Sequence, residues 1–164
     1  MNLNILEESI ENNDFEHALS IIAEIGRNKY KEAVPVLIKY LQSTDNNTLR
    51  NEIAMALSDI GSAEAVEPIV NMIRNPKTMG NRGTLLYALE AFDYSEYLEL
   101  FIDLLLNEDN FEVSRQALLL VESIVKDIPN EIKQEYVGKI TGEIESLQDK
   151  IDFLSESLDV LMME

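Results

Sequence analysis

The fold is decided by residues 49–61, which read Leu-Arg-Asn-Glu-Ile-Ala-Met-Ala-Leu-Ser-Asp-Ile-Gly. From Ile53 onward, apolar residues recur at i, i+1, i+3, i+4 and i+7, and the last of them is Ile60. This spacing places them on one wide face of an α-helix, whereas a strand would require alternation. Gly61 follows directly and suits the C-cap of that helix. The stretch therefore predicts an amphipathic helix that buries one face.

The same pattern returns at intervals of 32 residues. Residues 32–41 align with 64–73, and an earlier copy is visible at an offset of 35, with its extra residues in the link 27–30. Such periodicity is typical of stacked helical repeats. The aligned positions expected in the core are Ile53, Leu85 and Ala117; Ala54, Leu86 and Leu118; Ala56, Ala88 and Leu120; Leu57, Leu89 and Val121; and Ile60, Phe92 and Ile124.

Each unit is predicted to contain two helices, A and then B, joined by a polar turn. The turns are expected at residues 43–47, 75–81 and 107–110, and the first A helix is expected over 3–11. A single helical pair cannot bury its apolar face, so neighbouring pairs are expected to stack.

Three features of these units resemble the HEAT-repeat family: Pro35 near the start of an A helix, Arg50 at the start of a B helix, and Leu57-x-x-Ile60-Gly61. The resemblance covers roughly residues 14–125 and weakens outward, because Arg82 repeats Arg50 but Ser114 does not. It implies an all-α fold, a short right-handed α-solenoid whose B helices line a concave surface. We assign residues 1–128 to the repeats and residues 1–164 to a single domain.

The repeat pattern stops after Pro129. Apolar residues there are spaced alternately by three and four, which is an a/d heptad pattern. One interpretation is a coiled-coil stripe for a homodimer. The other, which we favour, is a capping helix or helical hairpin over residues 129–164 that covers the last repeat. The pattern leaves open whether this segment forms one helix or two, and a break would be expected at residues 147–149. The stripe consists of Val137, Ile140, Ile144, Leu147, Ile151, Leu154, Leu158 and Leu161.

Composition excludes several classes of function. The net charge is -18, from 13 basic and 31 acidic residues, which repels nucleic acid and anionic lipid and attracts a basic protein. With no cysteine and only His17, neither a thiolate nor a histidine-based catalytic or metal site can be assembled. We therefore expect no catalytic residue, no metal and no cofactor. The absence of a signal peptide or long apolar run predicts a cytoplasmic protein without a membrane partner.

Positions that the core leaves on the B helices form three rows across the units. Met55, Tyr87 and Leu119 form an apolar middle row, which predicts an interface rather than a purely solvated face, although these residues could instead fill gaps between B helices. Asp93 and Tyr94 would extend an acidic rim, unless Asp93 or Ser95 caps the next helix. The remaining candidate contacts lie in the two flanking rows. One row is Asn51, which aligns with Gly83 and Arg115, and the other consists of Ser58, Glu90 and Glu122.

A second resemblance concerns residues 81–97, with 110–114 downstream, which are similar to all-α immunity proteins of bacterial polymorphic toxin and contact-dependent inhibition systems. It implies a protein that binds and neutralises a toxin domain. A nuclease toxin would supply the basic surface that the acidity favours. We therefore expect a non-enzymatic protein-binding module, an immunity protein or alternatively a HEAT-repeat scaffold that is dimeric through its C-terminal helix.

Overall fold

The computed structural model describes residues 3–163, which form nine α-helices, four one-turn 3-10 helices and no strand. The α-helices are α1 Leu3–Glu11, α2 Phe15–Arg27, α3 Val34–Ser43, α4 Asn47–Ile60, α5 Val66–Arg74, α6 Gly83–Leu89, α7 Leu98–Asn107, α8 Phe111–Ile124 and α9 Asn130–Leu161. The 3-10 helices are η1 Lys31–Ala33, η2 Ala63–Ala65, η3 Pro76–Thr78 and η4 Ser95–Tyr97. The all-α prediction and the first A helix are confirmed.

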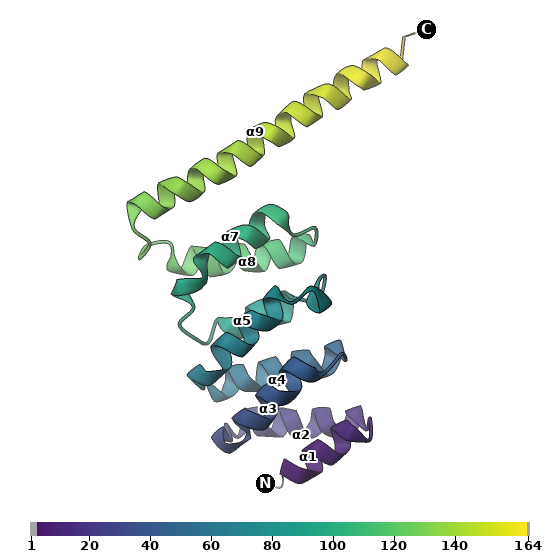
Figure 1. The fold of residues 1–164 in the computed structure, drawn as a ribbon, viewed down its shortest axis with the longest axis vertical. Helices are drawn as coiled ribbons and strands as arrows, with labels where there is room; N and C mark the ends of the chain where they lie inside the picture. Colours follow the sequence, from purple (N-terminus) through teal and green to yellow (C-terminus); the bar gives the residue numbers. More distant parts are fainter. Residues whose placement is uncertain (1–2, 164) are drawn as a thin grey trace. The chain divides into compact units, whose positions relative to one another are not determined.

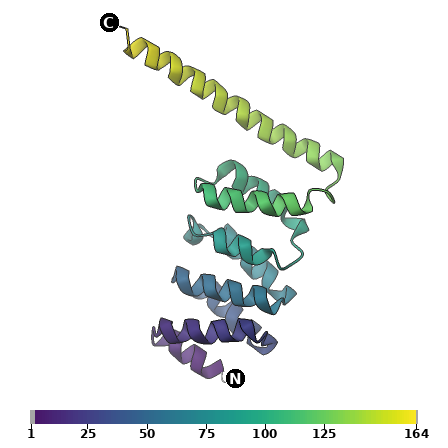
Figure 2. The ribbon, with the colours of Figure 1, turned by 180° about the vertical axis from the view of Figure 1, so that it is seen from behind.

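The chain divides into two compact units, Met1–Leu120 and Val121–Glu164. In the first unit, which we call the stack, α1–α8 form four successive pairs (Figure 1). The odd-numbered A helices form one layer and the even-numbered B helices form the other, which is seen from behind in Figure 2. The turns fall where the polar segments predicted them, between α3 and α4, α5 and α6, and α7 and α8. The assignment of both units to one domain stays a prediction.

The core of the stack follows the 32-residue alignment. Ile53, Leu57, Leu85 and Leu89 are completely buried, as predicted. Leu118 was also expected in the core, but 43% of it is exposed, so that prediction is wrong. Its equivalents Ala54 on α4 and Leu86 on α6 are completely buried, and a further helical pair follows each of these helices, whereas none follows α8 within the stack.

Two glycines meet different backbone requirements. Gly61 has φ 71°, and its N–H donates to the carbonyl of Leu57, so it ends α4 as the predicted left-handed cap. Gly26 allows close approach of α2 to α4, because a Cβ at this position would lie 3.0 Å from Cα of Ala56.

The second unit consists mainly of α9, a continuous helix of 32 residues. The break considered at residues 147–149 is therefore not present. None of the residues of α9 is buried.

Candidate protein-binding site

The three-row prediction can be tested on α4, α6 and α8. Side chains of the preceding turns cap the first turn of α4 and of α8. The Asn46 side chain accepts a hydrogen bond from the Leu49 N–H (3.0 Å), and that of Asn110 accepts one from the Glu112 N–H (3.0 Å). The middle row is more exposed on α6 and α8 than on α4: Met55 is half-buried, Tyr87 is 51% exposed and Leu119 is 43% exposed. An apolar row is therefore accessible from α6 onward.

The residues of the flanking rows also differ in exposure from helix to helix. Asn51 and Ser58 are half-buried on α4, whereas Glu90, which follows the last residue of α6, is exposed. Gln116 on α8 donates a hydrogen bond to the Glu90 carboxylate and so links the two B-helix segments. Glu122 is exposed on α8, but it belongs to the second unit and is not included in the site.

A cavity of about 350 Å³ lies between α6 and α8, and we call it the B groove. Its lining consists of Gly83, Thr84, Tyr87, Glu112 and Gln116. The sequence rows identified Tyr87 but missed Thr84 and Gln116, although these two residues are themselves 32 positions apart and could have been aligned as a further row. Glu112 was missed because it lies in the first turn of α8, outside the aligned core segment.

Carboxylates occur along the whole B-helix layer, and one of them, Glu112, lines the B groove. Exposed or half-buried acidic residues occur on every one of these helices or just after it, whereas Arg27 at the end of α2 and Arg115 on α8 are the exposed cations among the B-helix residues that the structure describes. Arg50 and Arg82 lie inside the stack instead. The acidic set consists of Glu16, Glu24, Glu52, Asp59, Glu90 and Glu112.

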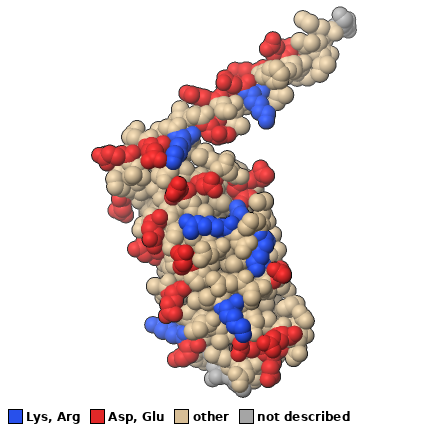
Figure 3. All heavy atoms as spheres, in the orientation of Figure 1, with Lys and Arg blue, Asp and Glu red and all other residues tan. Residues whose placement is uncertain are grey.

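Figure 3 shows the opposite face of the stack. It carries the A helices, and Lys and Arg side chains lie there among the acidic ones. On the A helices, Lys39 of α3 and Arg74 of α5 are exposed cations. Acidic residues therefore outnumber exposed basic ones on the helices of both layers, and those beside the B groove can act on a positively charged partner that contacts it.

Asp93 and Tyr94 do not join the B groove. The Asp93 carboxylate accepts hydrogen bonds from the hydroxyl (2.8 Å) and the backbone N–H (3.2 Å) of Ser95, which lowers the pKa of Asp93 and leads into η4. Tyr94 is only 7% exposed and packs edge-on against Phe101, with ring centroids 5.7 Å apart. Its prediction as a surface contact is wrong, because the ring is part of the core between η4 and α7.

Asp93 lines a different cavity, of about 600 Å³, between the α4–α5 and α6–α7 links. There the Tyr97 hydroxyl donates a 2.8 Å hydrogen bond to Glu67. This bond, together with partial burial, raises the pKa of Tyr97 to about 12. The contact joins two successive links of the stack, and we assign it a structural role.

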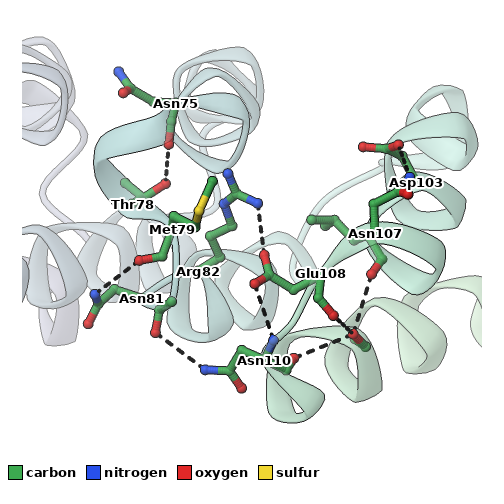
Figure 4. Close-up of polar contacts among 12 residues, drawn as sticks. Asn75, Thr78, Met79, Asn81, Arg82, Asp103, Asn107, Glu108 and Asn110 are labelled. Atoms are coloured by element: carbon green, nitrogen blue, oxygen red, sulfur yellow. Dashed lines mark hydrogen bonds and ion pairs between the residues drawn. The ribbon is translucent and has the colours of Figure 1, made fainter.

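The spacing of α6 and α8 is fixed by a polar network at the turns (Figure 4). Arg82 forms an ion pair with Glu108 at 2.8 Å, and their side chains are only 12% and 4% exposed. Asn110 donates from its backbone N–H to Glu108 (3.3 Å) and from its side chain to the Gly80 carbonyl (3.4 Å). Residues that hold the turns together therefore also hold the B groove open.

The arginine series has a structural explanation. Arg50 is 1% exposed and donates to the Asn47 side chain and to the Thr44 carbonyl (2.8 Å), and burial lowers its pKa. Arg82 occupies the equivalent position one unit later and reaches the next turn instead. At the third position the hydroxyl of Ser114 lies 3.3 Å from the carbonyls of Leu104 and Glu108. In the last turn, the short side chain of Ser114 thus forms the hydrogen bonds to backbone carbonyls that an arginine forms in the first.

These features define the chain as a short helical-repeat protein of the α-solenoid class, with a surface groove between B helices. A family model described as HEAT repeats matches residues 3–90, which is more than half of the chain, and the protein belongs to this family. None of the curated proteins and none of the solved structures matches significantly. HEAT repeats generally mediate protein–protein interaction, so the class is that of protein-binding scaffolds.

Two further properties concern residues 3–163. No helix in this range is sufficiently long and apolar to cross a membrane. No three His, Asp or Glu side chains in this range are grouped so that they could hold a metal ion.

Proposed function

We propose that this protein binds a basic protein partner through the B groove and the acidic B-helix surface around it. The observation that carries the proposal is Tyr87, a large aromatic side chain that is half exposed at the groove and has Glu90 and Glu112 beside it in sequence or space. Tyrosine is enriched among residues that dominate binding energy, because its rigid ring offers much contact area and its hydroxyl can form a hydrogen bond. No bound cofactor or chemical step is required for this function.

The charge distribution indicates the kind of partner. Carboxylates beside an apolar contact favour a positively charged surface and accelerate its encounter at low salt. A toxin domain that binds nucleic acid has such a surface. The similarity of residues 81–97 to immunity proteins supports a toxin domain as the partner. We therefore propose that the partner is a basic toxin domain, which the protein blocks by covering its nucleic-acid-binding surface.

The proposal is tested by co-purifying the protein with the products of its neighbouring genes. A tight complex with a basic toxin domain, weakened by added salt, is expected. Tyr87→Ala should weaken that complex at least tenfold while the helical content stays unchanged, since the side chain is half exposed. Loss of folding in this variant would show that Tyr87 is a core residue and that the groove is not the site.

A matched pair of charge reversals tests which layer of the stack, the A helices or the B helices, contacts the partner. Glu112→Lys lies in the first turn of α8 at the groove, and Glu99→Lys lies in the first turn of α7, an A helix. Both change the net charge equally, and both remove an acidic residue from a helix N-terminus. Glu112→Lys should slow association and weaken binding more than Glu99→Lys. Equal effects would mean that only the overall charge matters, and a larger effect of Glu99→Lys would place the partner on the A helices.

A further inference from the structure

The heptad stripe of α9 has the geometry of a two-stranded interface. Numbering heptad positions from Val137 as a, the a positions are Val137, Ile144, Ile151 and Leu158, and the d positions are Ile140, Leu147, Leu154 and Leu161. Three of the four a residues are β-branched and three of the four d residues are leucine. This combination favours parallel two-stranded coiled coils over other assemblies.

The charges of α9 are placed so that two copies can approach one another. Asp149 and Glu156 lie at f positions, and Glu145, Asp152 and Asp159 lie at b positions, all on the side of the helix away from the stripe. The positions flanking the seam contain only one acidic and one basic residue, Glu143 and Lys150, both at g, from Tyr136 to Leu161. A helix with this excess of acidic residues can therefore pair with itself without placing like charges opposite each other.

The length of the stripe argues against coverage by a single repeat. Residues 137–161 extend over about 37 Å at the rise of an α-helix. The helices of the last pair, α7 and α8, have 10 and 14 residues and reach only about 15 and 21 Å. The end of a HEAT stack could cover roughly half of the stripe, whereas a second α9 matches it along its whole length.

The surface available is sufficient for a specific dimer. All stripe residues except the half-buried Ile140 are between 51 and 83% exposed, and no residue of α9 is buried. Pairing two such stripes would remove on the order of 1,000–1,500 Å² from water, which reaches the size of specific protein interfaces. The two helix-weakening glycines, Gly138 and Gly142, fall at b and f, outside the seam.

From these observations we infer that the protein is a homodimer joined by a parallel, two-stranded coiled coil of α9, which replaces the capping role predicted from the sequence. The inference does not rest on the proposed function. If both hold, each dimer presents two B grooves, so that binding to a partner with two sites would be strengthened by avidity.

The mass of the full-length chain in solution tests the inference. Light scattering from micromolar to millimolar concentration should give twice 18.6 kDa. Leu147→Asp, at a d position, should weaken dimerisation by more than about 100-fold, because each dimer would bury two charges. Ser146→Asp adds the same charge one residue away, outside the seam, and should remain dimeric. A wild-type mass of 18.6 kDa throughout, or a mass three times that value, would overturn the inference.

Cross-linking tests the orientation, and the absence of native cysteines makes it unambiguous. Val137→Cys and Leu161→Cys place single thiols at opposite ends of the seam. In a parallel dimer, each variant alone should form its own disulfide-linked dimer under mild oxidation. In an antiparallel dimer, a mixture of the two variants would instead cross-link residue 137 to residue 161, and that result would overturn the parallel arrangement.

Discussion

The stack and α9 use apolar residues in two different ways. In the stack, each B helix has a wide apolar face with a period of 3.6, and Leu57 and Leu89 on these faces are completely buried by the same chain. In α9 the apolar stripe is narrow, repeats every 3.5 residues and has no buried member. A wide face is covered by packing against several helices of one chain, whereas a narrow stripe suits pairing with one long helix. The difference indicates that the stack folds on its own and that α9 serves association.

The largest expected effect comes from placing a charge in each region. Leu57→Asp would bury an unpaired carboxylate in the core and should cost more than about 5 kcal/mol, which is enough to unfold most small domains. Leu147→Asp should leave the melting temperature of the stack unchanged, since no residue of α9 is buried. Circular dichroism during heating measures both. A normal melting curve for Leu57→Asp would refute the core assignment, and a lowered one for Leu147→Asp would show that α9 folds back as a cap.

The ion pairs provide a second, smaller contrast. Glu108→Ala leaves the guanidinium of Arg82 buried without its carboxylate and should destabilise the stack by about 2–4 kcal/mol. Glu135→Ala removes the exposed pair with Lys139 on α9 and should cost no more than about 0.5 kcal/mol. Urea unfolding gives both values. The combination Arg82→Met with Glu108→Leu should recover much of the loss, because the buried charge is then gone. If the double variant were as unstable as Glu108→Ala, hydrogen bonding within the turns rather than the charge would be responsible.

The smallest expected effects come from alanine in place of glycine. A Cβ at Gly26 would meet the backbone of α4 at 3.0 Å, so Gly26→Ala should destabilise the stack by about 1 kcal/mol despite the higher helix propensity of alanine. Gly138 is surrounded by open space, and Gly138→Ala should stabilise α9 by up to about 1 kcal/mol. Hydrogen exchange of amides in α2 and α9 would report the two changes separately. Stabilisation in both variants would mean that α2 and α4 can separate slightly at no cost.

The sequence predicted most of the stack because its signals are local. The 32-residue repeat and the 3.6-residue period identified the helices, their turns and core residues such as Leu57. It failed at Leu118 and Tyr94, where burial depends on which element lies opposite. The core position of Leu118 lacks a following helix within the stack, whereas Tyr94 finds Phe101 across the α6–α7 link. Neither neighbour is encoded in the residues' own spacing.

The candidate site likewise has a part that the sequence predicted and a part that depends on the tertiary structure. Tyr87 could be selected from the sequence because the core pattern left it outward, and the acidity of the chain indicated a basic partner. The B groove itself depends on how far α8 stands from α6. That distance follows from contacts between turns, such as Arg82 with Glu108, whose residues are 26 positions apart.

By itself, the sequence determined the helical repeats, the acidity and the heptad stripe, since periodicity and charge are properties of neighbouring residues. Only the tertiary structure decided that the buried arginines pair with turns, that Tyr94 belongs to the core and that a groove opens beside Tyr87, and the structure also shows that residues 130–161 form one helix. The first three depend on how neighbouring elements of the stack pack against one another, which the spacing of apolar residues does not specify. The continuity of α9 depends on its two glycines being tolerated within one helix, a balance of small local terms that the heptad pattern does not reveal.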